Sequence, residues 1–270
     1  MYAHVHHMSD MHHYQRPKAF VYEAKVSVGN ALKTPEAHHW VEALNIEIKQ
    51  LIDTGTLRAV NLADVPADAT IINSTMVLRK KPDKYKARLC ACGNELKGQI
   101  AEIYSPTIGA LTYSTVHQIA IIDRLKVRII DTVGAYLYQT YPDTLPPIYI
   151  KMPVKVMQAC NIPDDVVYRI EKYIYGLPDS GRAYYQAYAK LLVDSGYVKS
   201  KSDPCLFLKF SSSEDRIYIC VHVDDTFVAA TTTDLLDEFE TVVKSQFKIS
   251  VKSDVDLYLG IILTIFLMMM

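Results

Sequence analysis

Residues 218–230 read Tyr218-Ile-Cys-Val-His-Val-Asp-Asp-Thr-Phe-Val-Ala-Ala230, and this stretch places two adjacent aspartates between two apolar runs. The runs are rich in Val, Ile, Tyr and Phe, so they predict two strands of a hairpin with Asp224 and Asp225 at its turn. The pair has two interpretations. Aspartate favours turns because its side chain hydrogen-bonds to nearby backbone. Paired carboxylates also supply the oxygen ligands that Mg²⁺ takes. The remainder of the chain is needed to choose between them.

Composition is ordinary for a globular protein. The chain has 270 residues, of which 50% are hydrophobic and 22% charged, so it allows one large domain or two small ones with a substantial core. The formal net charge is −1, which gives no overall field that favours nucleic acid. Charge is nevertheless uneven, because the stretch 76–99 carries seven Lys and Arg residues and 231–256 is predominantly acidic. Local patches, more than net charge, decide the binding of polyanions.

The cysteines and the two ends of the chain limit the class of protein. Five scattered cysteines argue against a secreted disulfide framework, and Cys90-Ala-Cys92 lacks the spacing of a zinc knuckle. Residues 1–33 are expected to be irregular and are rich in histidine, which indicates either a polar tail or a transition-metal tract. We see no signal peptide. The apolar run 257–270 is shorter than the roughly 17–25 residues of a membrane span, so we expect no membrane partner.

From residue 34 onward the pattern predicts one α+β unit without repeats or long linkers. The first helix should begin with Thr34 as its cap and Pro35 at its first position, and should end at Gly55. Further helices are expected at 114–125, 181–195 and 234–247, and strands at 70–78, 85–91, 126–131, 166–170, 205–210 and 217–223. The turn 80–84 makes the basic stretch a hairpin, which is either a solvated edge or a lid that grips phosphate.

Two acidic positions form a candidate constellation. Asp131 ends an apolar strand, and Asp224 and Asp225 lie at a hairpin turn, so adjacent strand ends in one sheet would bring three carboxylates together. Such a cluster is repulsive unless cations neutralise it. Two Mg²⁺ ions about 4 Å apart form the clamp that polymerases and nucleases use for phosphoryl transfer. One ion would activate the attacking hydroxyl, the other would hold the leaving pyrophosphate, and the basic hairpin would grip a triphosphate.

The order and spacing of several motifs resemble the reverse transcriptase domain of Ty1/copia-type retrotransposons over about residues 31–262. After a helix that carries Trp40, the motifs are Tyr85-Lys-Ala-Arg-Leu89, Tyr104-Ser-Pro-Thr107, Asp131-Thr-Val-Gly-Ala-Tyr-Leu137, Tyr173-Ile-Tyr-Gly-Leu177, Ser202-Asp-Pro-Cys-Leu-Phe207, Val221-His-Val-Asp-Asp225 and Tyr258-Leu-Gly-Ile261. The resemblance implies an α+β fingers–palm fold over 34–262, in which an antiparallel palm sheet packs on helices. Because the sequence ends soon afterwards in an apolar tail, 263–270, we expect a chain truncated before the thumb.

The resemblance also implies a function. The domain would be an RNA-directed DNA polymerase that adds deoxynucleoside triphosphates to a primer on an RNA or DNA template. It would use two Mg²⁺ ions, with Mn²⁺ as an alternative, and would work in the cytoplasm in the context of a virus-like particle. Template contacts would be mostly to backbone and shape.

The site residues carry over by position. The resemblance implies metal ligands at Asp131, the Thr132 carbonyl and Asp224, a supporting acid at Asp225, triphosphate contacts at Lys86 and Arg88, a steric gate at Tyr136, a floor beside the nascent base pair at Tyr175 and Gly176, and a primer grip at Leu259 and Gly260. Other interpretations remain for some of them. Tyr136 is also consistent with plain core, Lys86 and Arg88 with a shared solvent face, and 258–261 with an ordinary core strand.

Departures from the family pattern leave rival hypotheses open. His222 stands where the family usually has Tyr before Val-Asp-Asp, and an imidazole lacks the reach of a phenol. Asp179-Ser-Gly181 replaces a Gln-Ser/Ala-Pro sequence. One rival is a catalytically inactive, truncated remnant that keeps the fold and binds nucleic acid weakly at most. Another is a two-metal nuclease with the same acids, although the basic hairpin and Tyr136 suit a triphosphate better.

Overall fold

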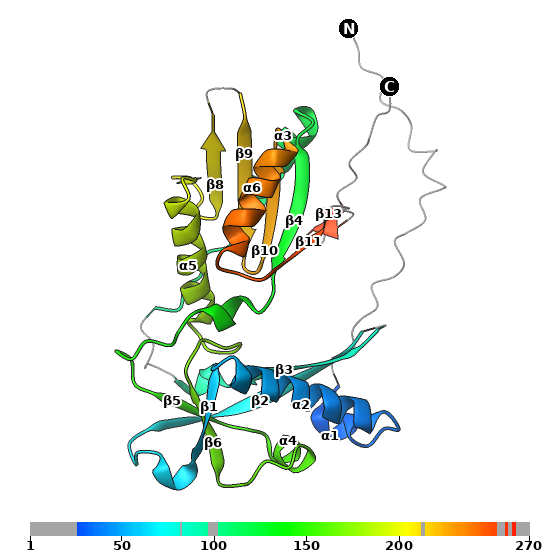
Figure 1. The fold of residues 1–270 in the computed structure, drawn as a ribbon, viewed down its shortest axis with the longest axis vertical. Helices are drawn as coiled ribbons and strands as arrows, with labels where there is room; N and C mark the ends of the chain where they lie inside the picture. The colour runs from blue at the N-terminus through cyan, green and yellow to red at the C-terminus, as the bar shows by residue number, and fades with distance from the viewer. Residues whose placement is uncertain are drawn as a thin grey trace.

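The computed structural model describes residues 26–81, 83–96, 102–211, 214–252, 257–258 and 261–262. Figure 1 shows these residues as two lobes, one above the other, and each lobe is built on one β-sheet with helices packed against it. The predicted α+β class is therefore confirmed. The lower lobe comes from the first part of the chain together with the segment around residues 141–177, and the upper lobe from the remainder.

The lower lobe holds a five-stranded sheet. Across the sheet its strands are β1 (Leu57–Asn61), β6 (Val166–Ile170), β5 (Ile148–Lys151), β2 (Thr70–Lys80) and β3 (Tyr85–Ala91). β2 and β3 form the antiparallel hairpin that the basic stretch predicted, whereas β2 and β5 are parallel. Helix α2 (Ala37–Asp53) turns Trp40, Leu44, Ile48 and Leu51 into the core of this lobe. The short helices α1 (Val28–Ala31) and α4 (Val154–Ala159) complete it.

The start of α2 differs from the prediction, whereas its end agrees. The helix begins at Ala37 after Glu36, whose side chain makes no capping hydrogen bond. Thr34 instead donates its hydroxyl to the Ala31 carbonyl at 2.8 Å, so it closes α1 and does not open α2. At the other end Gly55 has a φ of +65°, which glycine adopts without steric cost. Residues 26–33 thus include a short helix, and the rest of the N-terminal segment lies outside the described residues.

The upper lobe holds a six-stranded sheet. Its strands, in order, are β11 (Ile249–Lys252), β4 (Lys126–Thr132), β10 (Asp225–Ala230), β9 (Arg216–His222), β8 (Leu206–Phe210) and β7 (Val198–Lys199). Adjacent strands are antiparallel throughout. The three central strands place buried side chains on both faces, so the sheet needs helices on both sides.

Helices cover the two faces of this sheet. Helix α3 (Ala110–Ile122) packs on one face, where the Tyr113 ring meets the Phe227 ring edge-on at 5.3 Å. Helices α5 (Ser180–Asp194) and α6 (Thr233–Lys244) pack on the other face. In Figure 1, α6 lies in front of the sheet and α3 behind it. Because side chains alternate along a strand, neighbouring residues of β4 and β10 face different helices.

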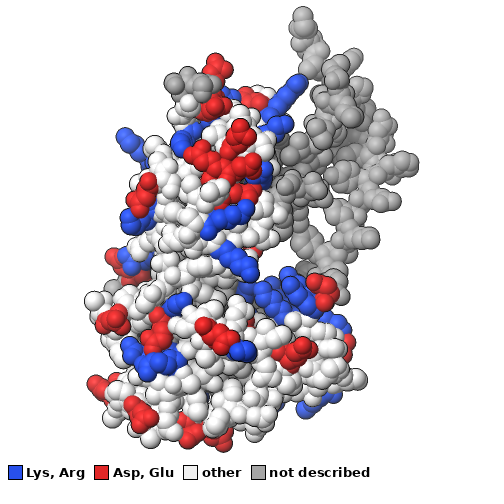
Figure 2. Space-filling model, in the orientation of Figure 1, with Lys and Arg blue, Asp and Glu red and all other residues white. Residues whose placement is uncertain are grey.

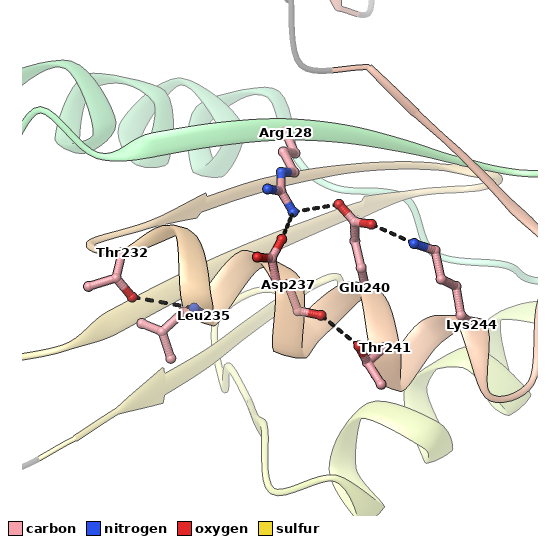
Figure 3. Close-up of polar contacts among 7 residues, drawn as sticks. All are labelled: Arg128, Thr232, Leu235, Asp237, Glu240, Thr241 and Lys244. Carbon is pink, nitrogen blue, oxygen red and sulfur yellow. Dashed lines mark hydrogen bonds and ion pairs between the residues drawn. The ribbon is translucent and has the colours of Figure 1, made fainter.

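An ion-pair network fixes α6 to β4 (Figure 3). The Arg128 guanidinium, whose side chain is only 17% exposed, bonds the carboxylates of both Asp237 and Glu240. Glu240 also accepts a bond from Lys244 Nζ at 2.7 Å. The Thr232 hydroxyl caps the start of the helix by accepting the Leu235 N–H. Strand β4, which carries Asp131 near its end, is thereby bonded to two consecutive turns of α6.

Several element boundaries differ from the predictions for identifiable reasons. Helix α3 begins at Ala110, four residues earlier than expected, because the Asp203 carboxylate holds the Gly109 N–H at 3.0 Å from far along the chain. It ends early because Arg124 takes a left-handed conformation with a φ of +53°. Strands β1, β5, β7 and β11 and helix α4 were not predicted. The expected tail at 263–270 lies outside the described residues.

Candidate active site

The structure gathers the three predicted acids at one end of the six-stranded sheet. Asp131 on β4 is the direct register partner of Asp225 on β10. Asp224 occupies the two-residue turn between β9 and β10, and its carbonyl accepts the Thr132 N–H at 2.8 Å. Main-chain hydrogen bonding therefore sets the positions of all three acids. All three carboxylate residues are partly exposed.

The turn that carries Asp224 is strained. Val223, the first residue of the turn, has a φ of +54°. Two-residue hairpins favour glycine or asparagine where φ is positive, and a β-branched residue in this region is an outlier. Such strain costs on the order of 1–3 kcal/mol and is typical of functional sites. The conformation of Val223 sets the position of Asp224 in the turn.

Two buried hydroxyl pairs support the acids from the opposite face of the sheet. Tyr184 on α5 donates to Thr132 Oγ1 at 2.9 Å, and one turn later Tyr188 bonds Thr226 Oγ1 at 3.1 Å. Burial is the main cause that raises the pKa of both phenols, so they stay protonated. Sequence reasoning missed this support. The signal for it was two tyrosines at helical spacing opposite threonines that follow or adjoin the acids.

Tyr136 and Tyr175 meet beside the acids. Tyr136 lies in a short 3₁₀ helix, Ala135–Tyr138, and its ring packs edge-on against the Tyr175 ring with centroids 4.7 Å apart. Burial raises the pKa of Tyr136, and the negative charge of Asp224 adds to this rise. Burial likewise raises the pKa of Tyr175 to about 12, although the nearby Arg88 opposes it. Both phenols are therefore neutral near pH 7 and lie within the field of Asp224.

Arg88 connects the lower lobe to this site. Its guanidinium carbon lies 4.0 Å from the centroid of the Tyr175 ring, in a cation–π contact. Lys86 is two residues earlier on β3 and shares the same strand face. Burial lowers the pKa of Lys86, and repulsion from Arg88 contributes. Figure 2 shows Lys and Arg side chains gathered over the region of the β2–β3 hairpin, on the side of the lower lobe that faces the upper one.

Gly176 allows the segment that carries Tyr175 to approach the end of β3 closely. It has a φ of +92°, and a Cβ atom there would lie 2.1 Å from the Ala91 carbonyl oxygen. Across the contact, a Cβ on Gly93 would lie 2.2 Å from the Gly176 carbonyl oxygen. The Ala91 N–H donates to the Tyr175 carbonyl at 2.7 Å. These contacts join the end of β3 to the segment that carries Tyr175.

Two further predicted features have different outcomes. Leu259 and Gly260 lie outside the described residues. His222 is the register partner of Asp225, on the same face of the sheet. Its Nδ1 atom is buried and, within the described part of the chain, has no hydrogen-bond partner.

The donor set suits a hard divalent cation. Carboxylate and carbonyl oxygens are the ligands that Mg²⁺ takes. Asp131 and Asp225 supply them from two adjacent strands, and Asp224 from the turn before β10. Among the described residues no three His, Cys, Asp or Glu side chains converge as a preformed metal cage. Mg²⁺ in phosphoryl-transfer sites is usually held by one or two carboxylates together with substrate phosphates. The residues present therefore fit a site that substrate completes.

The comparison with protein families decides the identity of this fold and site. Residues 58–265 match the family model described as reverse transcriptase (RNA-dependent DNA polymerase). The chain belongs to this reverse transcriptase family. The six-stranded sheet and its helices are accordingly its palm, and the five-stranded sheet with α2 forms its fingers. Within the described residues, no helix combines the length and apolar character needed to cross a membrane.

The relatives of this reverse transcriptase domain are polyproteins of retrotransposons. It is 29% identical to the Retrovirus-related Pol polyprotein from transposon RE2 of Arabidopsis thaliana, over 86% of this chain and 16% of the relative. It is 26% identical to the corresponding polyprotein from transposon TNT 1-94 of Nicotiana tabacum, over 82% of this chain and 17% of the relative. It is 24% identical to the Truncated transposon Ty1-A Gag-Pol polyprotein of Saccharomyces cerevisiae, over 84% of this chain and 18% of the relative. These matches confirm the predicted Ty1/copia resemblance.

The chain therefore spans less than a fifth of the length of these curated relatives. Among solved structures, it is similar to the prototype foamy virus protease-reverse transcriptase, with 14% identity and a TM-score of 0.47. That likeness covers 82% of this chain and 24% of the viral chain.

Proposed function

We propose that this reverse transcriptase domain catalyses template-directed addition of deoxynucleotides to the 3′-hydroxyl of a primer. The observation that carries the proposal is the convergence of two charged groups of opposite sign. Asp131, Asp224 and Asp225 lie at one end of the palm sheet, and Arg88 reaches over Tyr175 beside them. An acidic metal site next to a fixed guanidinium is the arrangement that a triphosphate substrate requires.

The three acids would have different roles. Asp131, Asp224 and the carbonyl of Thr132 would hold two Mg²⁺ ions, with Mn²⁺ as an alternative, and Asp225 would support them. When bound, the ions supply a lower pKa for the attacking hydroxyl and charge neutralisation for the leaving pyrophosphate. The protein contributes the rigidity of the arrangement, since β4 and β10 are anchored beneath the site by the Tyr184 and Tyr188 hydroxyls.

The surrounding residues would bind and orient the nucleotide. Arg88 and Lys86 would contact the triphosphate, with Arg88 held by the face of Tyr175. Tyr136 would pack under the sugar and disfavour ribonucleotides, and its neutral phenol next to Tyr175 supports this role. Tyr175 and Gly176 would form the floor beside the nascent base pair. The primer grip at Leu259 and Gly260 stays a prediction from the sequence.

The substrates and location follow from this chemistry. The substrates would be deoxynucleoside triphosphates and an RNA or DNA template with a primer, contacted mainly at the backbone. We propose a cytoplasmic setting within a virus-like particle, which the Ty1/copia resemblance supports.

The decisive experiment is primer extension on poly(rA)/oligo(dT) with Mg²⁺. Asp131→Asn and Asp224→Asn should each lower incorporation on the order of a thousandfold, because each removes several kcal/mol of metal-dependent stabilisation. Asp194→Asn is the matched control, since this aspartate is 59% exposed at the end of α5. Its rate should equal that of the unsubstituted chain.

Other results would favour the rival hypotheses. No incorporation by folded protein, together with salt-sensitive binding of the duplex, would leave an inactive remnant that binds nucleic acid. Cleavage of a labelled strand without added nucleotides would favour a nuclease. Circular dichroism of each variant checks that the fold is retained.

A further inference from the structure

The outer edge of the fingers sheet needs partners from outside the sheet. Among the residues that the structure describes, β3 is its last strand, so alternate N–H groups along it have no neighbouring strand to bond. Two of these groups belong to Leu89 and Ala91. The Ala91 N–H donates to the Tyr175 carbonyl at 2.7 Å. The Leu89 N–H donates to Glu47 Oε1 at 2.9 Å.

Arg88 lies beside both of these contacts. It immediately precedes Leu89 and is three residues from Ala91, so the strand position that sets its guanidinium is fixed at two places. One place is the floor segment that Arg88 itself stacks on. The other is the Glu47 carboxylate, which comes from a helix whose Leu44, Ile48 and Leu51 side chains are buried in the fingers core. A side chain on a firmly packed helix is thus the outer anchor of this edge.

Glu47 also lies in the field of the two basic residues. Burial raises the pKa of the Glu47 carboxyl, while the Leu89 N–H and the positive charges of Arg88 and Lys86 oppose that rise. The influence is mutual, because Glu47 partly offsets the repulsion that Lys86 receives from Arg88. Glu47 is neither one of the acids proposed to bind metal nor one of the residues proposed to contact the nucleotide.

We infer that Glu47 is a positioning residue for the nucleotide, because its carboxylate fixes the edge of β3 at Leu89 and so holds Arg88 over Tyr175. The inference rests on the proposed function, in which Arg88 contacts the triphosphate. What matters is the hydrogen bond more than the charge of the carboxylate, since an added negative charge near the triphosphate would by itself weaken binding.

Three substitutions separate the bond from the charge in primer extension. Glu47→Ala loses both and should raise the KM for the deoxynucleotide about five- to tenfold, the value of one hydrogen bond, with kcat changed less than about twofold. Glu47→Asp keeps the charge but is one methylene shorter, and should behave like Glu47→Ala. Glu47→Gln keeps an acceptor oxygen and should restore the KM to within about twofold. Glu42→Ala, at an exposed position of the same helix, is the control.

A second background distinguishes positioning from general structural damage. In an Arg88→Ala chain, Glu47→Ala should add less than about a twofold rise in KM, because the two residues act as one unit. Hydrogen exchange of the Leu89 amide should be faster in Glu47→Ala and Glu47→Asp than in Glu47→Gln. An equal rise in KM with and without Arg88 would overturn the inference, and so would a Glu47→Gln variant as impaired as Glu47→Ala.

A binding measurement keeps this result apart from the proposed function. The probe is a mant-labelled deoxynucleoside triphosphate with Mg²⁺, followed by fluorescence without turnover. If the unsubstituted chain incorporates nothing but binds the probe, and the variants rank in the predicted order, polymerisation is wrong and the Glu47 inference stands. If incorporation occurs with the same KM in all variants, the function stands and the inference is wrong. Failure of the unsubstituted chain to bind the probe also overturns the inference.

Discussion

The acidic residues of the palm and the basic residues of the fingers are held by different kinds of contact. Asp131 and Asp225 face each other in a main-chain ladder, with strands on both sides of each. Arg88 lies on an edge strand, whose outer N–H groups bond one carboxylate and one loop carbonyl. The central palm strand β10 is buried at nearly every position, whereas β2, which carries the fingers hairpin, alternates between buried and exposed.

This difference shows which half of the site single substitutions can adjust. A ladder between central strands cannot slip by one residue without reversing every side chain, so its register is strongly specified. The edge strand β3 has such a ladder only on its β2 side, so the position of its outer side depends on a few contacts. We therefore expect the geometry of the acidic residues to change only when the palm unfolds. The position of the basic residues should respond to single substitutions near β3.

The largest expected effect lies at Gly176, where the segment that carries Tyr175 contacts the end of β3. Gly176→Ala should cost about 4 kcal/mol of unfolding free energy, because the new Cβ would lie 2.1 Å from the Ala91 carbonyl oxygen at a φ of +92°. Gly196 has a similar φ of +85°, but a Cβ added there would have nothing within 4 Å. Gly196→Ala should therefore cost only about 1–2 kcal/mol. Urea unfolding measures both, and equal costs would show that the stability of the protein does not depend on this close approach.

The next effect compares an ion pair in each lobe. Arg128→Ala should cost about 2–3 kcal/mol, because Arg128 is mostly buried and its loss leaves Glu240, which is 13% exposed, without its main partner. Arg58→Ala removes the exposed fingers pair with Glu171 and should cost far less, because solvent screens an exposed ion pair. Thermal unfolding of both variants provides the measurement. A larger loss from Arg58→Ala would mean that the fingers, and not the palm, limit stability.

The sequence predicted elements whose signals are local. The hairpin around Asp224 and Asp225, the hairpin of the basic stretch and the end of α2 at Gly55 all follow from strand-forming residues, turn residues and glycine. The gathering of Asp131 with the acid pair required only that their strands be neighbours, and the register supplies this. Family membership follows from the order of motifs along the chain.

The sequence could not predict features that depend on distant partners. The start of α3 is set by the Asp203 carboxylate, which lies far along the chain from Gly109. β5 is a four-residue strand, too short for a periodicity to stand out, and it exists because β2 and β6 pair with it. The sequence gives no sign of a role for Glu47, because a charged residue on an amphipathic helix usually faces solvent. Its role depends on an edge strand that the helix pattern does not reveal.

A smaller, stabilising effect is expected at the turn that carries Asp224. Val223→Gly should raise the unfolding free energy by about 1 kcal/mol, because it relieves a β-branched residue at a φ of +54°, less the added entropy of the unfolded chain. Asn161→Gly is the control, since Asn161 has a φ of +53° that asparagine tolerates. It should change stability by less than about 0.5 kcal/mol. Urea midpoints test this, and a destabilised Val223→Gly would show that the turn is not strained.

The smallest effect should be visible only in alkali. Burial raises the pKa of Tyr175 to about 12 in the folded protein, against about 10 in an unfolded chain. Its stabilising contribution is therefore complete below pH 10, and is lost as the pH rises from 10 to 12, because only the unfolded chain readily releases the proton. Between pH 9 and pH 11, Tyr175→Phe should therefore lose about 1 kcal/mol less stability than the unsubstituted chain.

Tyr104→Phe, at a tyrosine that is 76% exposed, is the matched control for this slope. Urea midpoints at pH 9, 10 and 11 compare the three chains. If Tyr175→Phe and Tyr104→Phe gave the same slope, Tyr175 would be open to solvent, and the Arg88 guanidinium would lack the ring that holds it. The basic residues of the fingers would then be positioned by the edge of β3 alone. The contact between Glu47 and Leu89 would in that case be the main determinant of where Arg88 lies.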